Sequence, residues 1–152
     1  MTEQLAPTAR LSGAGTIRVG TDLVSVEDVA GSIAHFGDRY LRRVFTPTEL
    51  ATCTGPAGLS PERLAARFAA KESVVKVLRP DGGVRFHDIE VQLDGSGRPE
   101  VVLHGNMALR SQAIGLLDAS LSMSHDHGLA TAVLVAVIAS PQRESQGADV
   151  NV

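Results

Sequence analysis

The spacing of apolar residues predicts a strand followed by helices at the start of the chain. Apolar and polar positions mostly alternate through residues 16–24, which is the two-residue period of a strand. Ser25 is a good helix N-cap and Gly37 a good helix terminator, so a helix is expected over residues 26–36. A second short helical segment follows at residues 38–45.

Two proline-led caps predict the next two helices. Residues 46–49 read Thr-Pro-Thr-Glu, with a threonine cap, a proline in the first turn and a capping-box acid. Residues 54–61 form a Gly- and Pro-rich loop. Ser60 and the proline after it repeat the cap signal and begin a long helix to about Leu78, which "RPDGG" breaks.

The second half of the chain is richer in strands. Residues 87–105 read as a β-hairpin around a Gly-rich turn, and Asn106 is expected to cap a helix ending near Ala113. Residues 118–125 and 128–138 predict two strands joined by a tight turn. The last one is apolar at successive positions, which predicts a central strand covered on both faces. Hairpins mixed with helices favour an α+β fold over a doubly wound parallel sheet.

Length and composition fit one domain. The chain has 152 residues, 43% of them hydrophobic, enough for a single core. We place the domain at residues 15–139. Residues 1–14 and 140–152 are rich in small and polar side chains and predict flexible tails.

Charge and aromatic content argue against several kinds of partner. The net charge is −3 and only 3% of residues are aromatic, so neither nucleic acid nor an anionic membrane is expected to bind. The single cysteine, Cys53, rules out an internal disulfide and suits a reducing cytoplasm. The first residues do not resemble a signal peptide, and the apolar run at 129–139 is too short to span a bilayer. A soluble cytoplasmic protein is therefore expected.

The segment "RFAAKESVVK", residues 67–76, distributes its charges unusually for a surface helix. At about 100° per residue, Glu72 projects only about 40° from Phe68 and about 60° from Val75. A solvated helix normally separates charged side chains from large apolar ones. The placement therefore indicates that this carboxylate has a partner.

Two acids could form a site for a hard cation. Asp22 ends the first strand and Glu72 lies on the half-apolar helix, and a carboxylate in apolar surroundings needs a partner or a proton. Mg²⁺ takes one or two protein carboxylates and fills its other positions with water and phosphate oxygens. Phosphates would in turn need the cations of Arg67, Lys71 and Lys76. From the spacing alone, a plain surface pair between Glu72 and Lys76 is the favoured alternative.

The segment "SMSHDHG" allows several interpretations. His125 and His127 share one strand face with Met123 and could form half of a zinc site, but no CxxC or HExxH partner exists. A hydrolase triad would need a GxSxG elbow, and adjacent Ser124 and His125 point to opposite faces. A hairpin turn with a partly exposed imidazole is the simpler alternative.

Two further clusters could meet anions. Gly82 and Gly83, after the long helix, could offer backbone N–H groups to a phosphate, or could simply stop the helix. Arg39, Arg42 and Arg43 form a basic cluster in an acidic chain. They are either solvated or a docking site for an acidic protein partner.

Four segments together resemble one known family. In order, and with its spacing, they match the holo-acyl-carrier-protein synthases, the small single-domain 4′-phosphopantetheinyl transferases, over about residues 16–138. The segments are "VGTDLVSVEDV", "LAARFAAKESVVK", "FHDIEVQLDGSGRPEV" and "SMSHDHGLATAVLV". The resemblance implies an α+β fold with an antiparallel-rich sheet packed against a long central helix.

The resemblance also implies an activity. Members of the family transfer the phosphopantetheine arm of coenzyme A to a serine of apo acyl carrier protein, release adenosine 3′,5′-bisphosphate and require Mg²⁺. Asp22 and Glu72 would bind the metal, Lys76 would contact the transferred phosphate, and Glu72 would act as the base, directly or through a metal-bound water. Contacts to coenzyme A are implied for Arg67, Lys71, Lys76, Gly82, Gly83, Ser124 and His125.

The resemblance further implies a homotrimer with active sites between subunits. His125 would then serve the Asp22 and Glu72 of a neighbouring subunit. The resemblance does not distinguish a carrier of a fatty-acid synthase from one of a polyketide or peptide synthase. A non-catalytic module that binds coenzyme A or the carrier is the alternative, against which the acids and Lys76 argue.

The chain departs from the family's pattern at two places. Glu27 and Asp28 stand where relatives often carry a basic residue for the acidic carrier, so docking is expected to rest on the cluster of Arg39, Arg42 and Arg43. The loop "RPDGGV" replaces a tighter Gly-Thr-Gly type of loop.

Overall fold

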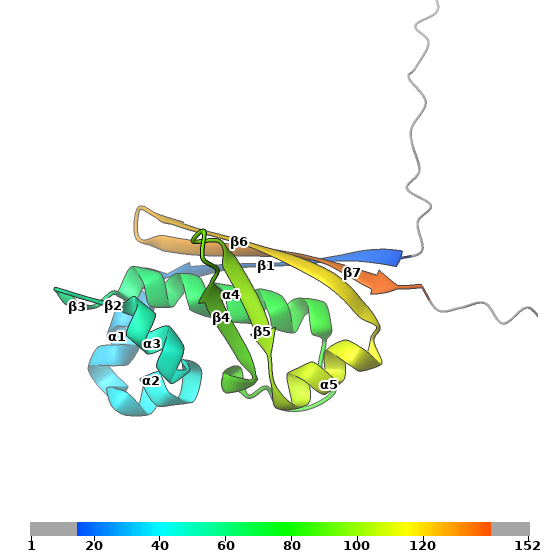
Figure 1. Ribbon diagram of the computed structural model, residues 1–152. Coiled ribbons are helices and arrows are strands. Elements are labelled where there is room, and N and C mark those ends of the chain that lie inside the picture. Colours follow the sequence, from blue (N-terminus) through cyan, green and yellow to red (C-terminus); the bar gives the residue numbers. More distant parts are fainter. Residues whose placement is uncertain (1–14, 141–152) are drawn as a thin grey trace, which may run out of the picture.

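A three-stranded sheet and a long helix organise the molecule (Figure 1). The computed structural model describes residues 15–140; the predicted tails, 1–14 and all but the first residue of 140–152, lie outside this range. In chain order the elements are β1 (Gly15–Ser25), α1 (Val26–Phe36), α2 (Asp38–Val44), α3 (Pro47–Cys53), β2 (Thr54–Gly55), β3 (Gly58–Leu59), α4 (Pro61–Leu78), the 3₁₀ turn η1 (Phe86–Asp88), β4 (Ile89–Leu93), β5 (Pro99–Leu103), α5 (Gly105–Ala113), β6 (Leu116–Asp126) and β7 (Leu129–Ala139). Every strand pair is antiparallel within residues 15–140, so the predicted α+β class is confirmed.

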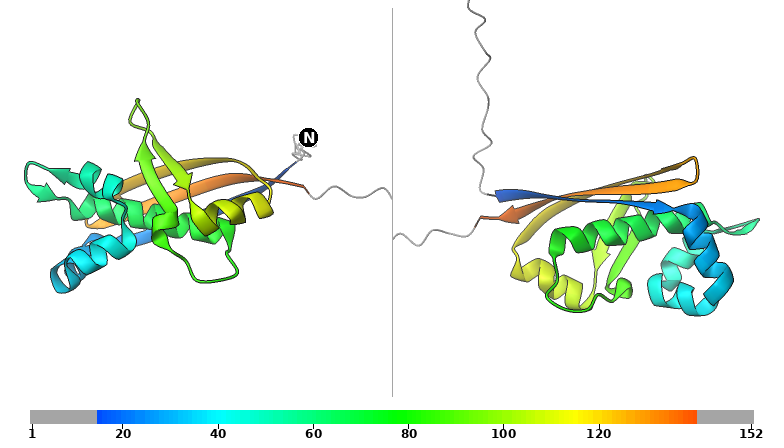
Figure 2. Two further views of the ribbon diagram at one scale, coloured as in Figure 1. Left: turned by 60° about the horizontal axis from the view of Figure 1, so that its bottom comes forward. Right: turned by 180° about the vertical axis from the view of Figure 1, so that it is seen from behind.

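The large sheet has the order β1-β7-β6, which puts β7 in the centre as predicted. Its inner face packs on α4, where Ala130 and Ala132 are fully buried. The prediction that β7 is covered on both faces is wrong for the part of this chain that the structure describes. Val133 and Val135 on the outer face are 38% and 40% exposed, because no element of residues 15–140 lies above the sheet (Figures 1 and 2).

Helix α4 is the central element beneath the sheet, as expected. Ser60 caps it by accepting from the backbone N–H of Arg63 at 3.3 Å, and Pro61 occupies its first turn. Its alanines at 65, 66, 69 and 70 are buried, which allows the strands to lie close to the helix. Among residues 15–140 no helix has the length and apolarity needed to cross a membrane.

The three N-terminal helices follow the predicted caps. The Ser25 hydroxyl accepts from Asp28 N at 3.2 Å, and the Thr46–Glu49 capping box is formed in both directions. The predicted loop at 54–61 instead contains a small hairpin, in which Thr54 pairs with Leu59.

The β4–β5 hairpin is confirmed, but the cap of the helix after it is not the predicted one. Helix α5 begins at Gly105, and the Asn106 side chain does not cap it. The Asn106 N–H donates instead to Asp88 Oδ2 at 3.1 Å. Asp88 comes from η1. The first turn of α5 is therefore bound by an acid distant in sequence, where a cap by the local Asn106 side chain was expected.

Candidate active site

Asp22 and Glu72 face one hollow between β1, α1 and α4. The hollow has a volume of about 450 Å³, and we call it the acid hollow. Its lining includes Asp22, Asp28, Ser32, Tyr40, Phe68 and Glu72. The strand end and the helix therefore bring together two acids that lie fifty residues apart in the sequence.

Glu72 is the more perturbed of the two acids. Its pKa is raised, first by burial and then by the negative charge of Asp22, while Lys76 opposes the rise. No lysine, arginine or histidine forms an ion pair with Glu72 in residues 15–140. A carboxylate in this setting favours either a proton or a cation.

Lys76 pairs with Asp22, so the simple pair with Glu72 is not formed. Its Nζ lies 2.8 Å from Asp22 Oδ1 and donates to the carbonyl oxygen of Thr21 at 2.6 Å. The side chain is half exposed, and an ammonium group has three donors. One donor of Lys76 therefore stays open to the hollow or to solvent.

Gly20 allows the strand and the helix to approach this closely. A Cβ on Gly20 would lie 2.0 Å from the carbonyl oxygen of Ser73. The Ser73 hydroxyl is shared between the carbonyl of Ala69 in its own helix, at 2.9 Å, and the carbonyl of Ala132 on β7, at 3.2 Å, so α4 also lies close to β7 here. Sequence reasoning missed both roles, although a glycine inside a strand is a known sign of close backbone approach.

Lys71 does not line the acid hollow, and its contact with coenzyme A stays a prediction to which its burial gives no support. The side chain is fully buried, and Nζ contacts Glu49 Oε2 at 2.8 Å and the carbonyls of Phe86 and Ile89 at 2.8 and 2.6 Å. All three donors are therefore used. Burial lowers the pKa of Lys71, and the charge of Glu49 opposes that shift.

Arg67 is also buried, at 4% exposure, and lies beside α3. It donates to Thr52 Oγ1 at 3.1 Å and to the Arg63 carbonyl at 3.4 Å. Its Nε has no hydrogen-bond partner within the described range. Arg67 does not line the acid hollow, so its role toward a phosphate stays a prediction.

His125 and Ser124 are not among the residues that line the acid hollow. They are on β6 and Asp22 is on β1, which are the opposite edges of the sheet. The pKa of Glu62, in the first turn of α4, is lowered mainly by backbone and Ser60 hydrogen bonds and to a smaller extent by His125. Glu62 and Glu72 are ten residues apart on α4, about 15 Å along the helix axis, so Glu62 lies well away from Glu72.

No zinc site forms around the "SMSHDHG" segment. His127 Nδ1 lies 2.8 Å from its neighbour Asp126 in an exposed turn. Within residues 15–140 no three His, Cys, Asp or Glu side chains gather as metal ligands would.

Gly82 and Gly83 lie in the exposed loop after α4. Arg110 of α5 fixes this loop by donating to the carbonyls of Leu78 and Arg79 at 2.9 and 2.8 Å and by pairing with Asp81 at 3.0 Å. No local sequence pattern indicates this anchor. The two glycines do not line the acid hollow, and their phosphate contacts stay a prediction.

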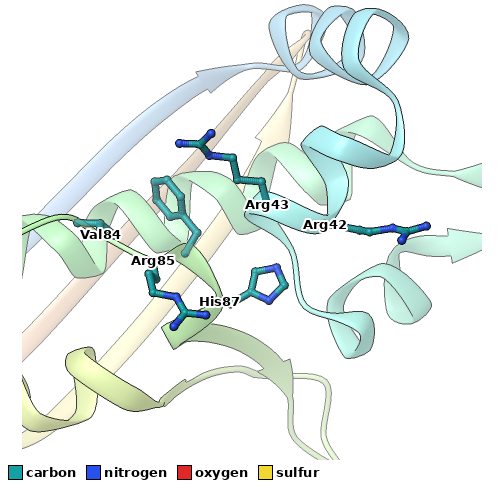
Figure 3. Close-up of a pocket in the computed structure, with 6 residues that line it drawn as sticks. Arg42, Arg43, Val84, Arg85 and His87 are labelled. Carbon is teal, nitrogen blue, oxygen red and sulfur yellow. The ribbon is translucent and has the colours of Figure 1, made fainter.

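The predicted basic cluster lines two further hollows. Phe36, Arg39, Tyr40 and Arg43 surround the first, which we call the tyrosine hollow. The second is the basic hollow, formed by Arg42 and Arg43 of α2 and by residues 84–87 (Figure 3). The arginines thus line surface hollows.

Comparison with known proteins agrees with this geometry. Residues 18–132 match the family model of the 4′-phosphopantetheinyl transferase superfamily. A holo-[acyl-carrier-protein] synthase of Koribacter versatilis is 44% identical over 118 residues, which is 76% of this chain and 94% of that protein.

Solved structures of such enzymes have the same fold. The ACPS–CoA complex of Chronobacterium ammoniagenes superposes with a TM-score of 0.71 at 32% identity, covering 83% of this chain and 99% of that one. Helicobacter pylori holo-[acyl-carrier-protein] synthase in complex with coenzyme A gives a TM-score of 0.67 at 28% identity, with 78% and 99% covered.

Proposed function

The chain belongs to the 4′-phosphopantetheinyl transferase superfamily, and we propose that it is a holo-acyl-carrier-protein synthase that moves phosphopantetheine from coenzyme A to a carrier serine. One observation carries the proposal: Asp22 and Glu72 line one hollow, and Lys76 forms an ion pair with Asp22. Two carboxylates and an ammonium group are what a reaction between a hydroxyl and a pyrophosphate requires. A module that only binds has no need for a base with a raised pKa.

The residues of the acid hollow fit Mg²⁺. Asp22 and Glu72 supply the one or two carboxylates that this ion takes from proteins, and Glu72 lacks an ion pair among residues 15–140. When bound, Mg²⁺ would neutralise the pyrophosphate and polarise its phosphorus–oxygen bonds.

The protein's own groups then perform the transfer. Glu72 accepts the proton of the carrier serine, directly or through a water, and its raised pKa makes it a stronger base than an ordinary carboxylate. The serine oxygen forms a bond to the β-phosphorus, and the bond from that phosphorus to adenosine 3′,5′-bisphosphate breaks. Lys76 uses its open donor to hold the phosphate and balance the charge of the leaving group.

We further propose a head-to-tail trimer with shared sites. Asp22 and His125 lie on opposite edges of the sheet, so one protomer's β6 side can meet the next protomer's β1 side. The outer face of the sheet is apolar, with Ile17, Val19 and Val135 exposed, and an interface would cover it. A head-to-tail contact that closes forms a ring.

Other parts of the assignment stay proposals. A cytoplasmic location is supported by the free thiol of buried Cys53. None of five residues with predicted coenzyme A contacts lines the acid hollow. These contacts would require a site formed with a neighbouring subunit, or a coenzyme A molecule that extends beyond the hollow; the residues are Arg67, Gly82, Gly83, Ser124 and His125.

Mass spectrometry of a carrier protein tests the proposal. Incubation with coenzyme A, Mg²⁺ and an apo acyl carrier protein is expected to add one phosphopantetheine to its serine. Glu72→Ala and Asp22→Ala should each abolish the addition while circular dichroism stays that of the wild type. The exposed Arg98→Ala is the control and should keep full activity. Failure of the wild type on fatty-acid, polyketide and peptide carriers would overturn the proposal in favour of a binding module.

A further inference from the structure

The basic hollow brings together three arginines and one histidine from two distant parts of the chain. Arg42 and Arg43 come from α2, and Arg85 and His87 come from the segment around η1 (Figure 3). The hollow has a volume of about 420 Å³, and no acidic side chain lines it. Arg43 and Arg85 form no ion pair with any residue of the described range. Their charges are thus available to an external partner.

The three hollows follow one another along the surface. Tyr40 lines both the acid hollow and the tyrosine hollow, and Arg43 lines both the tyrosine hollow and the basic hollow. Phe68 of the acid hollow also packs on Phe86 of the basic hollow, with ring centroids 5.5 Å apart. A partner whose serine enters the acid hollow would therefore extend over the basic hollow.

The other side of the acid hollow repels an acidic partner. Glu27 and Asp28 lie in the first turn of α1 and are exposed. The negative charges lie on α1, while the positive ones lie on α2 and around η1. An acidic partner is therefore directed away from the start of α1 and toward Arg43 and Arg85.

We propose that Arg85 and His87 join Arg42 and Arg43 as a docking contact for an acidic segment of the carrier protein. This inference rests on the proposed function, whose predicted docking cluster contained only the arginines at 39, 42 and 43. Residues 85 and 87 extend that surface to a second segment of the chain.

The orientation of the side chains favours a protein surface over a small anion. In Figure 3 the guanidinium groups of Arg42 and Arg43 point to opposite sides of the hollow, and Arg85 points in a third direction. A single phosphate needs donors that converge. Carboxylates spread along a helix, with about 5.4 Å per turn, suit cations that are spread apart.

Steady-state kinetics test the contact. Arg85→Glu combined with His87→Ala is expected to raise KM for an apo fatty-acid-synthase carrier protein about tenfold at low salt, a typical effect of losing exposed charge contacts. The kcat and the KM for coenzyme A should not change, and added NaCl should narrow the difference from the wild type. Arg98→Glu makes the same reversal in the β4–β5 turn, outside the three hollows, and should leave the carrier KM unchanged.

The outcomes separate this inference from the proposed function. A rise in KM for coenzyme A instead would assign the hollow to a small phosphate ligand and overturn the inference. A carrier KM equal to that of Arg98→Glu would also overturn it. If the wild type transfers nothing, the proposed function fails, but the docking inference is still testable. Calorimetric titration with the apo carrier then tests docking alone: a weaker affinity of the double variant than of the wild type supports the inference, and an equal affinity overturns it.

Discussion

Two neighbouring residues of α4 have opposite environments. Lys71 points into the core and uses every donor on Glu49 and two carbonyls, while Glu72, about 100° around the helix, faces the acid hollow. This explains why charged and apolar residues are mixed in "RFAAKESVVK". One amine stabilises the core, and the carboxylate beside it is available for chemistry.

Removing the buried amine should unfold the protein before it affects chemistry. Lys71→Ala leaves Glu49 buried without its cation, and we expect the free energy of unfolding in urea to fall by about 3–5 kcal/mol. Lys76→Ala is the matched comparison, because its pair with Asp22 is half exposed; it should cost at most about 1 kcal/mol. Similar stability losses for the two variants would contradict the structural role of Lys71.

At the scale of elements, close packing of β1 on α4 forms the site. Gly20→Ala would place a methyl group against the Ser73 carbonyl, and the helix must move away from the strand. Overpacking of this kind costs about 1–3 kcal/mol. We expect a lower midpoint in urea and a large loss of transfer activity, because Glu72 moves away from Asp22. Gly31→Ala, where a methyl group meets nothing within 4 Å, is the control.

The turn of the β4–β5 hairpin gives a prediction about pH. Asp94 Oδ1 accepts from the Ser96 hydroxyl and N–H, both at 2.7 Å, and from Arg98 N at 2.9 Å, and these bonds lower its pKa, the Ser96 hydroxyl most of all. A lowered pKa in the folded state means that the carboxylate stabilises the fold above about pH 4. That contribution is lost as the pH falls further.

Thermal unfolding of Asp94→Ala checks this sign. The variant should melt below the wild type at neutral pH, and the difference should shrink below about pH 4. A constant difference from neutral to acidic pH would show that the charge of Asp94 does not matter.

Most elements, but only part of the site, could be predicted from the sequence. Caps and periodicity located the strand and helices because those signals are local, and the family resemblance named Asp22, Glu72 and Lys76. The cap by Asp88 and the full burial of Lys71 were missed, because each depends on a partner distant in sequence. The approach at Gly20 is a tertiary contact of the same kind.

For the whole molecule, the separation of His125 from Asp22 is the feature that calls for a partner. The two lie on opposite edges of the sheet, and the outer face between them is apolar. If His125 takes part in the reaction, one subunit alone therefore has an incomplete set of active-site residues. We expect light scattering of the active protein to give the mass of a trimer.

Mixing two inactive variants tests the shared site. Glu72→Ala and His125→Ala damage different sides of the proposed interface, so mixed trimers should contain intact sites and regain activity. Glu72→Ala mixed with Asp22→Ala is the control and should stay inactive, because both changes affect the same side. If the first mixture also stays inactive, the shared-site arrangement is wrong.

The buried Lys71–Glu49 pair also determines the rotation of α4 about its own axis. The carboxylate of Glu72 lies about 5–6 Å from that axis, so a rotation of about 20° would move it by about 2 Å. Mg²⁺ accepts only oxygen distances near about 2.0–2.1 Å. Any change that loosens the pair in the core should therefore weaken the proposed binding of Mg²⁺ while the helix is still intact, so transfer activity should depend on the angular setting of α4.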